Sequence, residues 1–370
     1  MTENVAFFLP HFGHGGAEGV VLKLLQGIDR TSYAPVLILQ RGRGEFLERI
    51  PDNVKVVILK HPRLPGCVIE LARLFRREDI ALVVTLTNAA SLYSVLAARL
   101  ARSSVATLVT EHTPLSGFLA EAKAPVLRKA AVKRIYPHAT LTGGPIEDIG
   151  DEFKELLDDA APPYVVLPNP VVDEVGAFRS PPAVAHHIVS VGRLAPEKRF
   201  DLLIDAFDIL VRDTPDLRLT IFGEGSERPA LEAQIARLEL TGSVALPGFT
   251  SDLNTVHRSA DLFVCTSRRE GLGNAIIEAM ARGVPVVSVD CPFGPKRLLR
   301  DGASGHLVRQ DTPEAIAEAM RLVLADRALR CRYATAGQEI AQNYETKNAV
   351  AAYQAAFRRA IDIRAGTAEP

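Results

Sequence analysis

The segment SRREGLGNAIIEAMARGVPVVSVD, residues 267–290, combines a glycine-rich turn with the start of a helix. Gly271 and Gly273 let backbone amides come close to a ligand, and a helix that begins near Asn274 offers unpaired N–H groups there. Such a turn can hold an anion, for example the diphosphate of a nucleotide. An ordinary β-α-β turn uses the same glycines and is the alternative interpretation of this segment.

Two glutamates flank this turn. Glu270 precedes it, and Glu278 follows eight residues later, about one turn into the helix. A carboxylate at either place can accept hydrogen bonds from sugar or ribose hydroxyls. We expect Gly283 to end the helix as a left-handed cap. The alternative is that both glutamates are ordinary surface residues.

A pair of cations follows another expected strand in VGRLAPEKRF, residues 191–200. Arg193 and Lys198 suit a pyrophosphate leaving group, because a guanidinium can bind one phosphate through two donors while an ammonium neutralises another. Two solvated basic residues in a loop are the alternative.

Three further features are less specific. Gly15 and Gly16 lie in the loop FFLPHFGHGGAEGVV, residues 7–21, which is neither a P-loop nor a dinucleotide fingerprint but can bring N–H groups near a phosphate or sugar. FGEGSE, residues 222–227, contains a lone Gly-x-Gly. His112 follows an expected strand, and a structural histidine is the alternative to a functional one.

Short apolar runs rich in β-branched residues alternate with helical patterns along the whole chain. This alternation predicts parallel sheets that are covered by helices on both faces. The expected strands are residues 5–9, 35–40, 54–59, 81–86, 105–110, 139–142, 187–192, 217–223, 243–248, 261–267 and 285–290. The expected helices include residues 17–28, 89–101, 121–135, 200–211, 228–238, 274–282, 313–325 and 346–363.

Residues 167–187 contain four prolines and little periodicity, which indicates a linker between two domains. We therefore expect an α/β protein with two doubly wound, Rossmann-like domains. Sheets of this kind bind ligands at the carboxyl ends of their strands, so two such domains facing each other would form a cleft.

The 370 residues, 47% hydrophobic and 24% charged, have an ordinary globular composition with material for two cores. The four cysteines lie far apart without a C-x-x-C pair, which argues against a zinc site or a disulfide framework. Residues 80–98 carry no charge, but their five Ser, Thr and Asn residues favour a strand, a loop and a helix over a membrane span. The N-terminus lacks the basic region of a signal peptide, so we expect a cytoplasmic protein.

The net charge of −1 conceals a basic region. Residues 60–140 contain twelve Lys and Arg against five Asp and Glu. Five of these cations lie in the helix-like stretch 121–135: Lys123, Arg128, Lys129, Lys133 and Arg134. A surface of this kind can rest on the anionic lipids of the cytoplasmic face of a membrane, and a solvated surface with scattered cations is the alternative.

Five motifs occur together in an order and spacing that resemble one known family, the retaining glycosyltransferases of family 4. These are the group 1 glycosyltransferases, which have the GT-B fold and belong to the glycogen-synthase-like superfamily. The similarity covers nearly the whole chain and is strongest from about residue 187 to 310. The motifs are GGAE (15–18), VGRLAPEK (191–198), FGEGSE (222–227), LPGF (246–249) and EGLGNAIIEAMARGVPVV (270–287).

The resemblance implies a domain organisation. An N-terminal Rossmann-like domain, residues 1–175, would bind the acceptor, and a C-terminal one, residues 183–343, would bind a nucleotide sugar. The last helix, within residues 344–370, would cross back to the first domain.

The resemblance also implies roles for single residues. Arg193 and Lys198 would hold the donor diphosphate, Glu270 and His112 would contact the donor sugar, and Glu278 would bind the ribose. The remaining donor contacts would come from Gly15, Gly16, Gly223, Gly248, Phe249, Gly271, Leu272, Gly273 and Asn274, with Gly248 and Phe249 near the nucleobase.

Glycosyl transfer builds negative charge on the departing diphosphate, and cations and oriented N–H groups can stabilise it. The chain has no D-x-D motif, so we expect no metal and no cofactor, with a nucleotide-diphosphate sugar, by default a UDP-sugar, as the donor substrate. The resemblance implies retention of the anomeric configuration. The expected acceptor is a saccharide, such as a lipid-linked glycan or a precursor of polysaccharide or lipopolysaccharide, and no nucleic acid partner is expected. A sugar-nucleotide 2-epimerase on the same fold and a non-catalytic sugar-nucleotide-binding protein are the alternatives.

Overall fold

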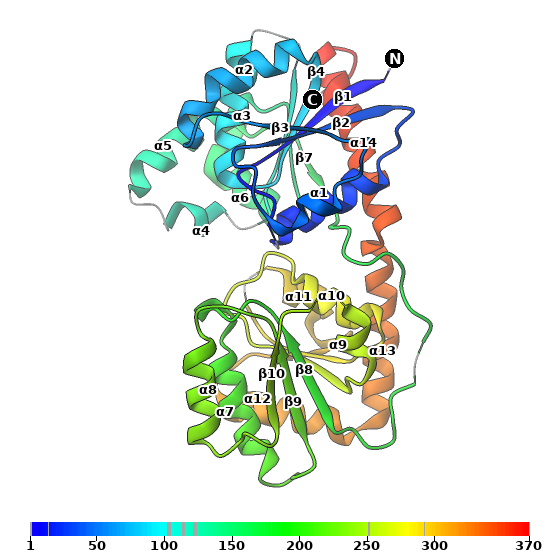
Figure 1. Cartoon of the computed structure of the whole chain (residues 1–370). Helices are drawn as coiled ribbons and strands as arrows, with labels where there is room; N and C mark the ends of the chain where they lie inside the picture. The colour runs from blue at the N-terminus through cyan, green and yellow to red at the C-terminus, as the bar shows by residue number, and fades with distance from the viewer. Residues whose placement is uncertain are drawn as a thin grey trace. The chain divides into compact units, whose positions relative to one another are not determined.

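The computed structural model describes residues 2–13, 15–101, 105–112, 115–120, 124–178, 180–250, 252–291 and 293–369. The chain forms two compact units. Unit 1 comprises Met1–Pro170 and Thr346–Pro370, and unit 2 comprises Val171–Glu345. Each unit is built on one parallel sheet with helices packed against it (Figure 1).

The sheet of unit 1 has the strand order β3-β2-β1-β4-β5-β6-β7. Strands that follow one another in sequence therefore run outward in both directions from the neighbouring pair β1 and β4, which is the doubly wound pattern. The strands are β1 (Glu3–Leu9), β2 (Tyr33–Leu39), β3 (Lys55–Ile58), β4 (Ile80–Thr85), β5 (Ala106–Thr110), β6 (Leu141–Gly144) and β7 (Tyr164–Val166).

Helices cover both faces of this sheet because its central strands are apolar on both sides. Helices α1 and α14 supply side chains to one core, which includes Val21, Leu25 and Phe357, while α2 and α3 supply Phe75 and Ala97 to the other. The helices of unit 1 are α1 (Gly16–Gly27), α2 (Cys67–Arg77), α3 (Asn88–Ala101), α4 (Leu115–Ala120), α5 (Pro125–Ile135), α6 (Glu147–Leu157) and α14 (Thr346–Ala365).

Unit 2 repeats the pattern with the strand order β10-β9-β8-β11-β12-β13, so its sheet is doubly wound about β8 and β11. The strands are β8 (His187–Val191), β9 (Arg218–Phe222), β10 (Val244–Gly248), β11 (Leu262–Cys265), β12 (Val286–Val289) and β13 (His306–Val308). The helices are α7 (Phe200–Val211), α8 (Arg228–Arg237), α9 (Leu253–Arg258), α10 (Asn274–Ala281), α11 (Gly294–Leu298), α12 (Pro313–Ala325) and α13 (Arg327–Ala341).

The stretch of unit 2 before β8 is held in place by hydrogen bonds to residues near the end of unit 2. Val172 forms an isolated parallel bridge with Glu345, and the Glu345 carboxylate accepts a hydrogen bond from the Val175 N–H at 3.0 Å. The fully buried guanidinium of Arg330 donates to the Pro182 carbonyl at 2.8 Å and to carbonyls at the end of α12. This proline-rich stretch therefore belongs to unit 2, and the two ends of unit 2 lie side by side.

The predicted fold class is confirmed. All eleven predicted strands occur, with ends shifted by no more than two residues, and residues 80–98 form a strand, a loop and a helix as expected. No helix within the described residues has the length and apolar character needed to cross a membrane. The helix predicted at 121–135 begins at Pro125, and Lys123 lies outside the described residues. The sequence analysis gave no range for the strands β7 and β13 or for the helices α2, α4, α6, α9, α11 and α13.

Candidate functional site

The loops after β8 and β11 meet at the carboxyl edge of the unit 2 sheet. These two strands are hydrogen-bonded neighbours, yet the chain continues from them toward opposite edges of the sheet. In open parallel sheets a ligand crevice forms at such a switch point. Lys198 lies in the loop after β8 and Glu270 in the loop after β11, so the fold brings these two predicted site residues to one place.

Lys198 and Glu270 form an ion pair, with 2.5 Å between Nζ and Oε1. The same carboxylate oxygen accepts a hydrogen bond from Ser267 Oγ at 2.7 Å. Burial disfavours the charged ammonium, but the attraction of Glu270 together with that of the neighbouring Cys265 and Glu197 outweighs it, so the pKa of Lys198 is raised. The side chains of Lys198 and Glu270 are 22% and 16% exposed, so the ion pair is largely enclosed by protein but still in contact with water.

A threonine that sequence reasoning missed holds the Lys198 loop in position. Thr266 Oγ1 lies 2.9 Å from the Lys198 carbonyl and 3.0 Å from the Arg199 carbonyl, to which it donates. Arg199 has a φ of +53°, a left-handed conformation that is unfavourable for a side chain of this size, and its guanidinium pairs with Asp311 at 2.7 Å. Strain held in place by surrounding contacts is common next to functional sites.

The glycine turn before α10 has the geometry that an anion site requires. Gly273 caps the helix with a φ of +92°, which a residue with a side chain rarely adopts. Leu272, between the two glycines of the turn, is buried. The helix begins at Asn274, and the Gly273 carbonyl accepts hydrogen bonds from the N–H groups of Ile276 at 2.9 Å and Ile277 at 3.3 Å. Gly283 has a φ of +69°, which confirms the predicted left-handed cap.

The loops after β8, β9 and β10 pack against one another through their backbones. Gly223 N–H donates to the Gly248 carbonyl at 2.9 Å. A Cβ at Gly223 would lie 1.9 Å from the Gly192 carbonyl oxygen, and its φ is +147°, so only glycine fits. Phe249, the next residue along from β10, is 56% exposed. This close packing brings the predicted residues Gly223, Gly248 and Phe249 to the same edge of the sheet as Lys198.

Arg193 and Glu278 complete the predicted set in unit 2. The Arg193 side chain is 72% exposed and pairs with Glu197 at 2.5 Å, so each cation of the motif is held by a carboxylate. Glu278 lies half-buried on α10, one turn after the glycine cap.

In unit 1 the loop after β1 leads into α1 through Gly15 and Gly16. These two glycines differ in the space around them. A Cβ at Gly15 would lie 1.9 Å from Glu18 Oε2, whereas a Cβ at Gly16 would meet nothing within 4 Å. Burial raises the pKa of Glu18, although its own backbone N–H and nearby His11 lower it. The Glu18 carboxylate lies 3.4 Å from His11 Nδ1, a contact that sequence reasoning did not single out.

His112 follows β5, and its imidazole is enclosed by side chains of unit 1. Nε2 lies 3.3 Å from Thr110 Oγ1 and 3.4 Å from the Tyr353 hydroxyl of α14. Burial lowers the pKa of His112 to about 4, although the nearby Asn169 side chain raises it. The ring is therefore neutral at physiological pH. Neither Tyr353 nor Asn169 carries a sequence signal that would link it to His112.

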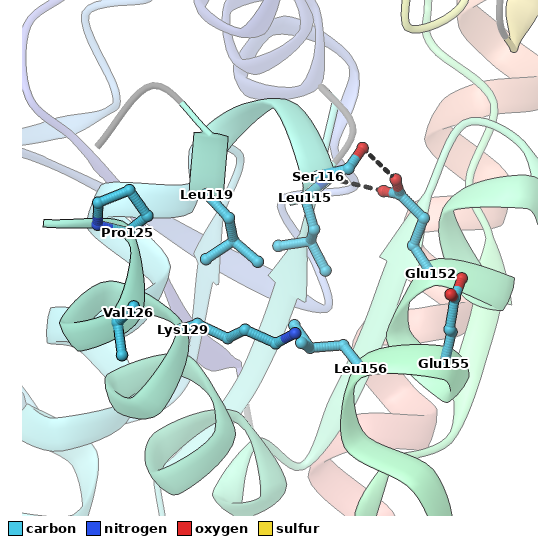
Figure 2. Close-up of a pocket in the computed structure, with 9 residues that line it drawn as sticks. All are labelled: Leu115, Ser116, Leu119, Pro125, Val126, Lys129, Glu152, Glu155 and Leu156. Atoms are coloured by element: carbon cyan, nitrogen blue, oxygen red, sulfur yellow. Dashed lines mark hydrogen bonds between the residues drawn. The ribbon is translucent and has the colours of Figure 1, made fainter. Parts of the chain in front are cut away.

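Unit 1 also contains a pocket of about 420 Å³ between α4, α5 and α6, shown in Figure 2. Leu115 and Leu119 line it from α4, and Lys129 extends from α5 toward α6. Glu152 of α6 accepts hydrogen bonds from the Leu115 N–H at 2.7 Å and from Ser116 at 2.5 Å. The pocket is thus mainly apolar, with an ammonium and carboxylates at its border.

Comparisons with known proteins agree for both units. Residues 182–340 match the family model "Glycosyl transferases group 1", and residues 14–175 match "Glycosyltransferase Family 4". The lipopolysaccharide core biosynthesis glycosyltransferase LpsE of Rhizobium meliloti is 37% identical over 43% of this chain and 45% of that protein. Several curated relatives are matched over less than half of their own length.

Some relatives are matched over nearly their whole length. One of them is the Campylobacter jejuni N-acetylgalactosamine-N,N'-diacetylbacillosaminyl-diphospho-undecaprenol 4-alpha-N-acetylgalactosaminyltransferase, 28% identical over 90% of this chain and 93% of that protein. Among solved structures, Anabaena Alr3699/HepE in complex with UDP and glucose superposes with a TM-score of 0.77 at 21% identity, over 95% of this chain and 99% of that one. This likeness shows the same fold.

Proposed function

Because family models match both of its units, the chain belongs to the group 1 glycosyltransferases of family 4, and we propose that it transfers a sugar from a nucleotide-diphosphate sugar to a hydroxyl of a saccharide acceptor. The observation that carries this proposal is the Lys198–Glu270 pair beside the glycine cap of α10. A cation, a carboxylate and a helix N-terminus at one switch point match the diphosphate and the sugar of such a donor.

Unit 2 would bind the donor. In the bound state the diphosphate would take over the cations that carboxylates hold in this structure, with Lys198 and Arg193 on its oxygens and the N–H groups at Asn274 beside them. Glu270, released from part of its interaction with Lys198, would accept hydrogen bonds from the sugar hydroxyls. Glu278 would bind the ribose, and Gly248 and Phe249 would border the nucleobase.

The reaction would break the bond between the sugar C1 and the diphosphate oxygen while the acceptor oxygen bonds to C1. The proton of the acceptor hydroxyl would pass to the departing phosphate oxygen. We propose that this occurs on one face of the sugar, with the retention of configuration that the family resemblance implies. Lys198, Arg193 and the α10 N–H groups would stabilise the negative charge that develops, so that no metal is required.

Unit 1 would supply the remaining contacts. Gly16 is the open position of the β1 loop, where a phosphate or sugar could approach the start of α1. Gly15 lies beside it, and the neutral His112 would contact the donor sugar through hydrogen bonds. A neutral imidazole can donate from one nitrogen and accept at the other, which suits hydroxyl recognition.

We propose a UDP-sugar as the donor and a lipid-linked saccharide as the acceptor. The donor proposal is supported by the Anabaena structure, which is a complex with UDP and glucose. The acceptor proposal is supported by the Campylobacter relative, whose name describes a diphospho-undecaprenol acceptor. Both matched proteins are similar to this chain over at least 90% of its length.

We also propose that α5 rests on anionic lipids at the cytoplasmic face of a membrane. Its residues Arg128, Lys129, Lys133 and Arg134 give it four cations and no acidic residue. Val126 and Leu127 are 81% and 72% exposed on the same helix. Exposed apolar side chains next to several cations are typical of helices that lie in a lipid interface.

The enzymatic proposal is tested with a panel of UDP-, GDP- and ADP-sugars in EDTA, with wild-type protein and Glu270→Ala. Release of the nucleotide diphosphate from one donor, with metal absent and with the activity lost in the variant, would support it and identify the donor. Conversion of a donor into its epimer without an acceptor would instead identify a 2-epimerase. No turnover of any donor, together with no UDP binding by calorimetry, would identify a non-catalytic protein.

The membrane proposal is tested by flotation with vesicles that contain or lack anionic phospholipid, at low and high salt. Binding should require the anionic lipid and weaken with salt, because Coulomb attraction between exposed charges is screened. A variant with Glu at residues 128, 129, 133 and 134 should remain unbound. Unchanged binding by that variant would refute the role of α5.

A further inference from the structure

Glu111, the residue before His112, carries a carboxyl group that lies wholly inside unit 1. Its side chain is fully buried, and the Tyr136 hydroxyl at the end of α5 lies 2.8 Å from Oε1. Oε2 has no hydrogen-bond partner among the residues that the structure describes. The Ser91 hydroxyl is also near, but its proton already has the Thr87 carbonyl as an acceptor at 3.0 Å. The carboxyl group therefore has few donors around it.

The elements around Glu111 supply no cation to balance a negative charge, as far as the described residues extend. Strands β4 and β6 carry no charged residue. The charged residues of α3 and α5 are Arg99, Arg128, Lys129, Lys133 and Arg134. None of these five cations is among the groups that shift the pKa of Glu111. Tyr136 is the titratable group that faces the carboxyl, and burial keeps it neutral by raising its pKa well above the usual value.

These surroundings favour the neutral form of the carboxyl group. A buried carboxylate needs a cation or several donors to replace the lost water, and without them the group takes up a proton instead. Glu111 has one close hydroxyl and one bare oxygen, which a neutral carboxylic acid tolerates at much lower cost. Burial accordingly raises the pKa of Glu111 to about 8, although the hydroxyls of Tyr136 and Ser91 lower it. At neutral pH the group is thus mainly protonated.

The position of Glu111 in the sheet links its protonation to the candidate site. Its N–H donates to the Gly143 carbonyl of β6 at 3.0 Å, so the extended backbone of β5 continues through this residue. Side chains of successive residues in a strand point to opposite faces. Glu111 therefore contacts Tyr136 beside α3, while His112 contacts Tyr353 of α14 on the other face. The buried Glu111 side chain fixes the strand end from which His112 extends.

We propose that Glu111 is a positioning residue whose carboxyl group is protonated in the active enzyme, and that its ionisation displaces the strand end that presents His112. The proposal rests on the proposed contact between His112 and the donor sugar. When the carboxyl group loses its proton to solvent, the buried charge is stabilised by moving toward water, and His112 moves with it. Activity should therefore be lost as the pH rises through the pKa of Glu111, while His112 itself stays neutral.

NMR of the full-length protein, with ¹³C at the glutamate Cδ atoms, measures the protonation directly. The Glu111 signal, assigned by its absence in Glu111→Gln, should report a protonated carboxyl at neutral pH and titrate with a midpoint at about pH 8. The ring signals of His112, assigned by their absence in His112→Gln, should shift with the same midpoint in the wild type but not in Glu111→Gln. Tyr136→Phe removes a hydroxyl that favours ionisation, so the midpoint should move to higher pH.

Steady-state turnover should follow the same titration. In the wild type kcat should fall about tenfold between about pH 7 and 9, because about nine-tenths of the Glu111 carboxyls are ionised one unit above a pKa of about 8. Glu111→Gln keeps the shape and the neutral state of the side chain, so its kcat should lack this fall. Glu155→Gln is the matched control. It removes an exposed carboxylate from α6 of the same unit and should keep the pH profile of the wild type.

Three results would overturn the proposal: a Glu111 carboxyl already ionised at neutral pH, His112 signals that do not follow Glu111, or an alkaline fall in kcat that persists in Glu111→Gln. Where Glu111→Gln does not fold, the carboxyl signal that moves in Tyr136→Phe identifies Glu111, and the wild-type spectrum decides. The spectra are also independent of turnover. A wild-type protein without transferase activity would refute the proposed function, while the response of His112 to Glu111 would still be judged by NMR.

Discussion

Replacement of Lys198 by Met tests whether its ammonium stabilises a departing diphosphate. Methionine keeps most of the length of the side chain but removes its charge. In this structure the ammonium lies 2.5 Å from Glu270, and the attraction of Glu270 and neighbouring groups raises the pKa of Lys198 in spite of burial. The side chain is only 22% exposed, so water would not replace the lost charge fully.

The expected effect on catalysis follows from these surroundings. At an effective dielectric constant of about 20, two unit charges about 4 Å apart attract each other by about 4 kcal/mol. Loss of one preorganised donor to a developing oxyanion reduces turnover by about 10²- to 10³-fold. We therefore expect kcat/KM of Lys198→Met to fall by about 10²- to 10³-fold. The free energy of unfolding should fall by only about 1–2 kcal/mol, because Ser267 still donates to the partly exposed Glu270 carboxylate.

The assay is donor turnover in EDTA at saturating and limiting donor, with chemical denaturation measured in parallel. Arg321→Met is a suitable control, since Arg321 also forms a 2.5 Å ion pair, with Glu318, on α12. Its turnover should equal that of the wild type. The reasoning would be refuted if Lys198→Met retained kcat/KM within about fivefold of the wild type, or if both variants lost activity in proportion to lost stability.

Three further outcomes are expected from stability measurements. Gly223→Ala should lower the free energy of unfolding by about 2 kcal/mol or more, because the added Cβ would lie 1.9 Å from a carbonyl oxygen. Gly242→Ala is the control. It should change the free energy of unfolding by less than about 0.5 kcal/mol, because the space around its Cβ is open. Arg330→Met should lower the free energy of unfolding, measured in urea, by about 3 kcal/mol or more, because buried carbonyls lose their hydrogen-bond donor. A change below about 1 kcal/mol would contradict this role of Arg330. Burial lowers the pKa of His257 to about 4, below its unfolded value of 6.5, so its contribution to stability is present above about pH 6.5 and is lost as the pH falls toward 4. His257→Phe should therefore have a melting temperature that falls less between pH 7.5 and 5 than that of the wild type; an equal fall would show that His257 is not responsible.

The fold was largely predictable because strands buried on both faces consist of continuous apolar runs. The strands that were missed lie at sheet edges and are short: β7 and β13 have three residues each, with only partly buried or exposed side chains apart from Val308. The segment before β8 was predicted as a linker from its prolines. Its attachment to unit 2 depends on Arg330 and Glu345, distant side chains that leave no local pattern.

The candidate site was predictable where it depends on strand ends. Lys198 and Glu270 are 72 residues apart, yet each follows a strand, and parallel strands end at one edge of the sheet. The left-handed Arg199, its support by Thr266 and the contact of Tyr353 with His112 were not predictable. These depend on tertiary packing between elements that share no local sequence pattern.

The bridge between Val172 and Glu345 means that unit 2 can be exchanged as one segment. The chain enters unit 2 and leaves it at adjacent points, so unit 2 is a cassette inserted into unit 1 through two neighbouring junctions. Exchange of residues 171–345 for the corresponding segment of another family member would then leave both Tyr353 and His112 in their original core. In such a chimera the donor contacts proposed for unit 2 would come from the inserted cassette, while those proposed for His112 and Gly16 would stay with unit 1.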